Sequence, residues 1–152
     1  MTAVRWAYED FAEGMTIELG KRHVTAAEII EFAGEFDPQP FHLDEAAGKA
    51  SVLGGLSASG WHTCGIFMRM LCDTLLIDSS SQGGPGVDLV RWKRPVLAGD
   101  TLTGKGMVRS KRVSQKRPHI GLVAWHYDLF NQRGEIVFEF ENTVMFSRRE
   151  VA

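Results

Sequence analysis

An acid and an imidazole lie close together in the segment from Asp37 to His42, which reads D-P-Q-P-F-H. Residues five positions apart on a helix point away from each other, but Pro38 and Pro40 disfavour a helix here. We therefore expect an extended, bent connector that turns both side chains toward one cavity. A carboxylate and an imidazole that share a cavity can move protons to and from water or a substrate. In the alternative interpretation, Asp37 only ends a helix and His42 is a hydrogen-bonded loop residue.

The surroundings of Asp37 favour a role as a base. This residue follows a predicted helix, whose C-terminal end is the negative end of the helix dipole, and it lies close to Glu35. Both features disfavour the ionised carboxylate, so we expect the pKa of Asp37 to be raised toward neutrality. A carboxyl group with such a pKa is a more useful proton acceptor.

The second half of a site is predicted at the start of a long apolar helix. Gly54, Gly55 and Gly60 let a ligand approach the backbone closely, and the free amides of a helix start carry a partial positive charge. Such amides could hold the oxygen of a polarised carbonyl. Trp61 and His62 are candidates to line the pocket, although a core position is the more common one for such a tryptophan. The alternative is a flexible loop followed by a plain capped helix.

The long helix is predicted over Leu56–Ile77, with Ser57 or Ser59 as its cap. Its apolar residues fall on nearly all sides, which is typical of a helix enclosed by the rest of the protein. The stretch is long enough to span a bilayer, but Arg69 and Asp73 lie inside it, and charges in mid-span are costly in lipid.

The remaining pattern predicts one more long helix and a sheet. Thr25 to Glu28 has the form of a capping box, so a helix should begin there and end near Asp37, before Pro38. One more helical turn is expected over Leu43–Gly48. Strands are expected where apolar and polar residues alternate, over Thr16–Leu19, Val87–Lys93, Thr101–Arg112, Gly121–Phe130 and Ile136–Phe146. Consecutive strands joined by short turns favour antiparallel pairing, so we predict an α+β fold with an antiparallel sheet around the long helix.

Size and charge exclude several classes of protein. The 152 residues fit a single domain spanning residues 1–152, and a net charge of −2 gives no reason to expect nucleic acid or a membrane as a partner. The first residues do not form a basic segment followed by an apolar run, so we do not expect secretion. Cys64 and Cys72 would lie about 12 Å apart along the predicted helix, too far for a disulfide. Buried thiols in a reducing, cytoplasmic compartment are therefore expected.

The usual signatures of metal, nucleotide and serine-nucleophile sites are missing from the sequence. Its five histidines and two cysteines lack the paired spacing of a zinc site. The glycine-rich stretch Gly83–Gly86 precedes a strand and does not join a strand to a helix, as a phosphate-binding loop would. A basic cluster between two predicted strands is either a solvated turn or, near a pocket mouth, a contact for the phosphates of a carrier: Lys111, Arg112, Lys116 and Arg117.

These motifs resemble those of the MaoC-like dehydratases, the family of (R)-specific enoyl-CoA hydratases. The resemblance runs from about Thr16 to Phe146, nearly the whole chain. The D-x-x-x-x-H element ahead of the long helix is its more specific part, and the Pro-Val and Gly-Asp elements are mainly structural. The residues that carry it are Asp37–Asp44, Gly54–Leu56 with Ser59–His62, and Arg94–Val96 with Gly99–Leu102.

The resemblance implies a hotdog fold, in which an antiparallel sheet curls around a central helix. It implies that Asp37 and His42 hold a catalytic water and that the Gly60 amide binds a thioester oxygen, with Ser59 and Trp61 at the substrate. Many members have histidine where this chain has Ser59, a difference that bears on which acyl chains or head groups are accepted. A homodimer or higher homo-oligomer is expected, since a single curled sheet leaves a strand edge exposed.

The implied reaction adds water across the 2,3 double bond of an enoyl-CoA, or removes it from a 3-hydroxyacyl-CoA, with no cofactor. Two other functions remain open. One is a hotdog thioesterase, in which a carboxylate activates water against the thioester carbonyl itself. The other is a non-catalytic acyl-CoA-binding subunit. The pair Asp37 and His42 favours hydration over thioester hydrolysis without excluding it.

Overall fold

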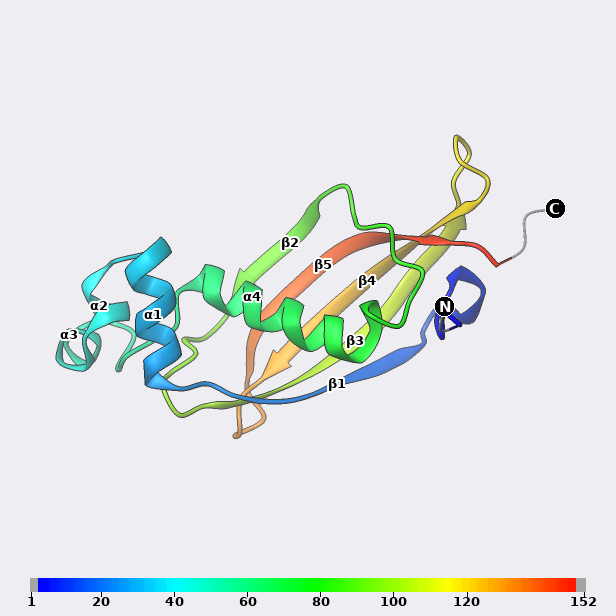
Figure 1. Cartoon of the computed structure of the whole chain (residues 1–152). Helices are drawn as coiled ribbons and strands as arrows, with labels where there is room; N and C mark the ends of the chain where they lie inside the picture. The colour runs from blue at the N-terminus through cyan, green and yellow to red at the C-terminus, as the bar shows by residue number, and fades with distance from the viewer. Residues whose placement is uncertain (1–2, 150–152) are drawn as a thin grey trace.

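The computed structural model describes residues 3–149, and its main layer is one antiparallel sheet of five strands in the order β1-β3-β4-β5-β2 (Figure 1). All five predicted strands are confirmed, and only β1 is clearly longer than expected. The strands are β1 (Thr16–His23), β2 (Val87–Trp92), β3 (Thr101–Val113), β4 (Ile120–Phe130) and β5 (Ile136–Ser147).

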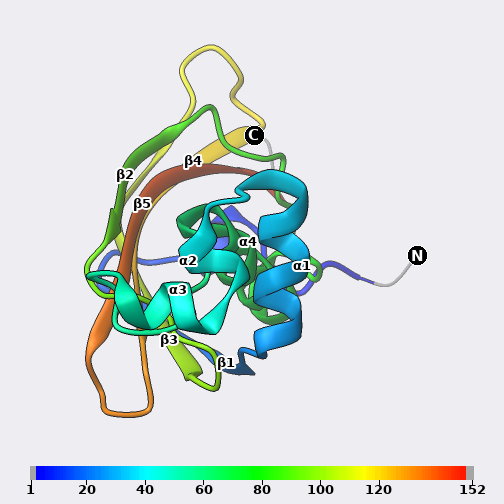
Figure 2. The same ribbon diagram turned by 90° about the vertical axis from the view of Figure 1, so that its left-hand side faces the viewer.

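The helices form the second layer. Helix α4 (Gly60–Leu71) continues into a π-helical turn, η2 (Cys72–Leu76), and lies along the sheet (Figure 1). The end-on view in Figure 2 shows the sheet curving around α4. The short helix η1 (Tyr8–Asp10) lies near one end of the sheet, and α1 (Ala26–Phe36), α2 (Pro40–Leu43) and α3 (Glu45–Ala50) lie at the other. The predicted α+β fold, with a sheet around a central helix, is confirmed.

Phe67 of α4 shows how the helix is held to the sheet. Its side chain is fully buried, and its ring centroid lies 5.0 Å from that of Tyr127 on β4 and 4.7 Å from that of Phe140 on β5. Trp125 and Leu129, which alternate with Tyr127 toward the same face of β4, are also fully buried. Burying each such side chain contributes roughly 1.5–3 kcal/mol, so the period-two pattern fixes which face of the sheet receives α4.

Helix α4 begins at Gly60, so Ser59, one of the two predicted caps, is its N-cap residue, and the start at about Leu56 is wrong. The preceding residues are extended because they pair with the segment that follows β2. Ser57 forms a β-bridge with Leu97, and the Ala58 amide donates to the Val96 carbonyl at 2.8 Å. This pairing carries the chain past the end of β2 before the helix starts.

One face of α4 is open, so the prediction of a helix enclosed on most sides is also corrected. Trp61 is 64% exposed and Met68 is 39% exposed. In Figure 1, α1, α2 and α3 lie at the start of α4 and leave its later turns uncovered. Cys64 and Cys72 are half-buried free thiols. Between residues 3 and 149, no helix has the length and apolar character needed to cross a membrane.

The segment that carries the acid and the imidazole is only partly extended. Helix α1 begins as predicted, with the Thr25 hydroxyl accepting from the Glu28 amide at 3.2 Å, and it ends with Asp37 as its C-cap. The expectation of an extended connector up to His42 is wrong, because Pro40 starts α2. Proline suits the first position of a helix, where its missing N–H would have no helical acceptor.

Candidate active site

A pocket of about 470 Å³ opens where the end of α1, helix α2, the start of α4 and the end of β2 meet. Asp37, His42 and Gly60 all line it, so the structure brings the predicted pair and the predicted helix start into one cavity. Much of the remaining lining is apolar, which suits the hydrocarbon part of a ligand. These apolar residues include Phe41, Val52, Leu53, Ala58, Pro95 and Val96.

His42 is buried and its ring is fixed by the backbone. Its Nδ1 lies 2.6 Å from the carbonyl oxygen of Ser57. A carbonyl oxygen only accepts hydrogen bonds, so Nδ1 carries a proton. The other ring nitrogen, Nε2, lies 3.4 Å from Asp37 Oδ2. In the neutral imidazole Nε2 is an acceptor beside a carboxylate, and the two can share the hydrogens of one water molecule.

The carboxylate of Asp37 is held by two neutral donors. The Ser59 hydroxyl donates to Oδ2 at 2.6 Å, and the Gln39 side-chain amide donates to Oδ1 at 2.7 Å. The backbone amide of Asp37 donates to the Ala33 carbonyl at 2.9 Å, which fixes the residue to the last turn of α1. Both the position and the orientation of the acid are therefore set before a substrate arrives.

The pKa of Asp37 lies below its ordinary value of 3.8, so the predicted rise is wrong. The hydrogen bond from Ser59 is the largest cause, and it lowers the pKa. Burial acts in the opposite direction, while the Gln39 hydrogen bond and the charge of His42 lower the pKa further. The donors thus stabilise the ionised form more than burial destabilises it. Asp37 is consequently a carboxylate at neutral pH.

Ser59 supports the acid from behind the pocket. It occupies the N-cap position of α4, yet its side chain makes no capping hydrogen bond and bonds Asp37 instead. It is fully buried and does not line the pocket. The structure thus places Ser59 behind Asp37, and a direct contact between Ser59 and substrate stays a prediction.

Gly60 is the first residue of α4, so its amide has no acceptor within the helix. Trp92, at the end of β2, donates from its indole Nε1 to the Gly60 carbonyl at 2.8 Å. A Cβ atom on Gly60 would lie only 2.6 Å from the Trp92 ring, so only glycine fits this close approach. Sequence reasoning missed Trp92, although an aromatic residue just before the Arg94-Pro95 motif was a usable signal.

Trp61 and His62 have different roles in the structure. Trp61 lines the pocket, and its ring packs edge to face on Trp92 at a centroid distance of 5.4 Å. His62 is buried away from the pocket and stacks on Phe32 at 4.8 Å. Burial lowers the pKa of His62, and the charge of Glu28 only partly opposes this. Of the two predicted pocket residues, Trp61 lines the pocket and His62 belongs to the packing between α1 and α4.

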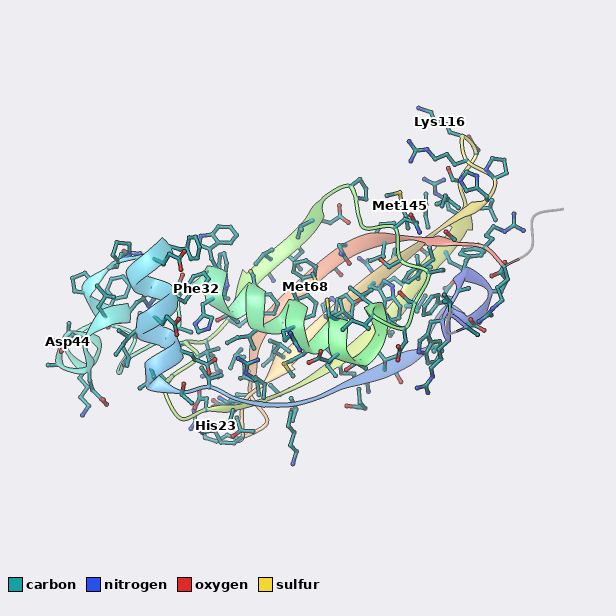
Figure 3. The ribbon with its side chains drawn as sticks, in the orientation of Figure 1. His23, Phe32, Asp44, Met68, Lys116 and Met145 are labelled. Atoms are coloured by element: carbon teal, nitrogen blue, oxygen red, sulfur yellow. The ribbon has the colours of Figure 1, made fainter. Side chains whose placement is uncertain are left out.

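The predicted basic cluster lies far from the pocket. Figure 3 shows Lys116 at the β3–β4 turn, at the opposite end of the molecule from Asp44, which precedes α3. Lys111 instead lies over the ring of Tyr8, with its Nζ 4.3 Å from the ring centroid. Lys93 and Arg94, which follow β2, are the basic residues that line the pocket.

Comparisons with known proteins agree with this fold. The family model of the MaoC like domain matches residues 10–123. The uncharacterized protein YdeM of Bacillus subtilis (strain 168) is 28% identical over 140 residues, which cover 92% of this chain and 98% of that protein. The crystal structure of a MaoC-like dehydratase from Rhodospirillum rubrum has a TM-score of 0.87 at 42% identity and covers 95% of this chain and 99% of its own. An (R)-hydratase of Pseudomonas aeruginosa has a TM-score of 0.75 at 22% identity, with 96% of this chain and 91% of its own covered.

The chain belongs to the MaoC-like family, because the family match spans residues 10–123 of the 152. Its sheet and central helix form a hotdog fold. At 22% identity, the likeness to the (R)-hydratase shows the shared fold. The family includes hydratases and dehydratases.

Proposed function

We propose that this protein is a hydro-lyase that adds water to the 2,3 double bond of an enoyl thioester, or removes it from a 3-hydroxyacyl thioester. The observation that carries the proposal is the shared pocket of Asp37, His42 and Gly60. A charged acceptor, an imidazole and a free helix-start amide are the three groups that the reaction needs. Family membership supports the same reaction class.

In the proposed reaction the Gly60 amide binds the carbonyl oxygen of the thioester. Negative charge grows on that oxygen as the reaction proceeds, and a fixed amide at a helix start stabilises it. Electron density is thereby drawn from the double bond, and the third carbon becomes electrophilic. Trp61 and the apolar wall of the pocket contact the acyl part of the substrate.

The water molecule is held between Asp37 Oδ2 and His42 Nε2, which are 3.4 Å apart. Its oxygen bonds to the third carbon while one of its protons passes to this pair, and the pair returns a proton to the second carbon. Both residues then regain their starting protonation. A carboxylate with a lowered pKa is a weak base, so the fixed position of the water and the charge stabilisation at Gly60 must supply most of the rate.

The test measures loss of the enoyl double bond and release of free thiol in parallel, with purified protein and a panel of enoyl thioesters. Asp37→Asn and His42→Ala should each lower the hydration rate by about 100- to 10,000-fold. Asp44→Asn is the matched control. Asp44 is exposed and caps α3 by accepting from the Ala47 amide, a role that asparagine also fills.

Three outcomes would overturn the proposal. Unchanged hydration in Asp37→Asn and His42→Ala would remove the pair from the mechanism. Thiol release without loss of the double bond would identify a thioesterase. Tight binding of acyl thioesters without either reaction would identify a binding subunit.

The proposed working form is a homodimer or a higher homo-oligomer. Within residues 3–149, β2 is an edge strand that pairs only with β5, and edge strands expose unpaired backbone groups. The open face of α4 adds Trp61 and Met68 as exposed apolar side chains. A second copy of the chain would cover apolar surface of this kind.

A further inference from the structure

Trp92 links the end of β2 to the first residue of α4. Its indole Nε1 donates to the Gly60 carbonyl at 2.8 Å, and its side chain also lines the pocket that holds Asp37 and His42. The proposed reaction uses the Gly60 amide and the water between Asp37 and His42, but it assigns no task to the Trp92 indole. The position of this indole beside Gly60 indicates what that task is.

Two hydrogen bonds join the chain on either side of the Gly60 amide to the segment 92–96. On one side, the Ala58 amide donates to the Val96 carbonyl at 2.8 Å. On the other side, the Trp92 indole donates to the Gly60 carbonyl. The N–H of Gly60 lies between these two points of attachment, so both bonds restrain its direction.

The remaining bonds of this peptide unit lie within α4 and its cap. The amide of Gly60 belongs to the same peptide unit as the Ser59 carbonyl, which accepts from the Thr63 amide at 3.0 Å and from the Thr63 hydroxyl at 3.4 Å. These two bonds shape the first turn, and they move with the helix as one unit. The bond from Trp92 differs because it comes from the sheet. It fixes the helix start relative to the opposite wall of the pocket.

Glycine at the first position of α4 makes such a restraint useful. Glycine has more conformational freedom to lose than any other residue. A Cβ atom on Gly60 would lie only 2.6 Å from the Trp92 ring, so the ring excludes a larger residue and limits the movement of the glycine. A donor stabilises a developing oxyanion most when its direction is fixed before the reaction.

The Trp92 ring is held by the sheet and by the helix. Trp92 pairs with Phe138 in the register between β2 and β5, so its backbone belongs to the sheet. Its ring packs edge to face on Trp61 at a centroid distance of 5.4 Å. The indole therefore contacts two consecutive residues of the first turn, Gly60 and Trp61, and its own position is well defined.

We propose that Trp92 is a positioning residue, which holds the Gly60 amide in the direction that binds the thioester oxygen. The inference rests on the proposed function and adds a residue that acts through Gly60. Negative charge on the thioester oxygen is larger in the transition state than in the bound substrate, so a misdirected amide weakens the transition state most. Loss of the indole donor should therefore lower kcat more than it raises KM.

The test replaces Trp92 with phenylalanine, which keeps an aromatic ring beside Gly60 and removes the N–H donor. With the best enoyl thioester of the panel, kcat should fall about 10- to 100-fold while KM changes by less than about threefold. Trp6→Phe is the matched control, because Trp6 stacks on Phe11 at 5.9 Å and does not line the pocket. This control should leave kcat and KM unchanged.

A spectroscopic measurement separates the direction of the amide from the shape of the pocket. The probe is butanoyl-CoA, which has no double bond to hydrate, with a heavy carbon isotope at its carbonyl. Difference infrared spectra should show a lower carbonyl stretching frequency on binding to the unaltered protein, because a hydrogen-bond donor polarises the carbonyl. This shift in frequency should be smaller in Trp92→Phe and complete in Trp6→Phe.

The outcomes separate this inference from the proposed function. A complete carbonyl shift or an unchanged kcat in Trp92→Phe would overturn the role of Trp92 and leave the proposed function in place. A higher KM at constant kcat would assign Trp92 to substrate binding and would also overturn it. If the unaltered protein hydrated no enoyl thioester, the proposed function would fail. The carbonyl shift of bound butanoyl-CoA, with and without Trp92→Phe, would still decide whether Trp92 directs the Gly60 amide.

Discussion

The hydroxyl of Ser59 donates a 2.6 Å hydrogen bond to Asp37 Oδ2, the same oxygen that lies 3.4 Å from His42 Nε2. The side chain of a serine at a helix N-cap ordinarily accepts a hydrogen bond from a backbone amide in the first turn of its own helix. In this protein the Ser59 hydroxyl makes no capping hydrogen bond to α4 and donates to Asp37 at the end of α1. Ser59 thus leaves the first amides of α4 without a side-chain partner and keeps Asp37 ionised. It therefore acts on both parts of the proposed site, the helix-start amide and the carboxylate.

Ser59→Ala should raise the pKa of Asp37, because the Ser59 hydrogen bond is the largest influence lowering it. A depressed pKa stabilises the fold above the unfolded value of 3.8, and this stabilisation is lost as the pH falls through the folded pKa. The variant should lose roughly 1.5–3 kcal/mol at neutral pH, typical of a hydrogen bond to a charged group. This loss of stability should become smaller at acidic pH, where Asp37 is protonated. Urea unfolding between acidic and neutral pH measures the loss of stability. The pH at which the hydration rate falls in acid measures the change in the pKa of Asp37.

Ser79→Ala is the control for that experiment. Its hydroxyl donates to a neutral acceptor, the Leu76 carbonyl, at 2.8 Å. The control should lose stability by the same amount at every pH and leave the acid limb of the rate in place. A pH-independent loss in Ser59→Ala as well would contradict the electrostatic role of Ser59.

The sheet and α1 could be predicted because their signals are local. Alternation along β4 and β5 places Trp125 and Phe140 on the inner face, and the Thr25 capping box marks the first turn of α1. The start of α4 could not be predicted in this way. Residues 56–59 are small and apolar enough for a helix, and what extends them is a β-bridge between Ser57 and Leu97, far apart in sequence.

The sequence predicted which residues line the candidate site, but it did not predict the direction of the pKa shift of Asp37. Asp37 and His42 share a cavity as their spacing suggested. The direction of the Asp37 pKa shift was missed because its main cause, Ser59, lies 22 positions away along the chain. Helix dipole and near neighbours are visible in sequence, whereas a donor brought in by folding is not. The same limit applies to Trp92, which meets Gly60 only after β2 and α4 pack together.

Gly60→Ala should destabilise the protein by roughly 1–3 kcal/mol, because the added methyl group overlaps the Trp92 ring. The cost should fall sharply in a Trp92→Ala background, where the ring is gone, and a double-mutant cycle of urea unfolding measures this coupling. Gly34→Ala is the control, since a Cβ there meets nothing within 4 Å. That substitution in α1 should stabilise by roughly 0.5–1 kcal/mol. Additive costs for Gly60→Ala and Trp92→Ala would show that the two residues are not in contact.

His126 should stabilise the fold at low pH more than at high pH. Burial is the largest influence on its pKa and lowers it, but Glu141 and Asp128, each 3.0 Å from one ring nitrogen, together raise the pKa above 6.5. A raised pKa gives stabilisation that is complete below 6.5 and is lost as the pH rises through the folded pKa. The stability difference between the unaltered protein and His126→Gln should therefore shrink with rising pH in urea unfolding. A stability difference that stayed constant or grew with rising pH would contradict this role of His126.

Met68→Glu should convert the proposed homodimer into a monomer. Met68 is 39% exposed on the open face of α4, and a second copy that covers this face would bury the new carboxylate without a partner. Met107→Glu is a closely matched control, because Met107 is 41% exposed on the outer face of β3, where it faces away from α4. Sedimentation velocity should show a monomer for the first variant and an unchanged dimer for the second. A dimer that survives Met68→Glu and dissociates in Met107→Glu would place the interface on the outer face of the sheet.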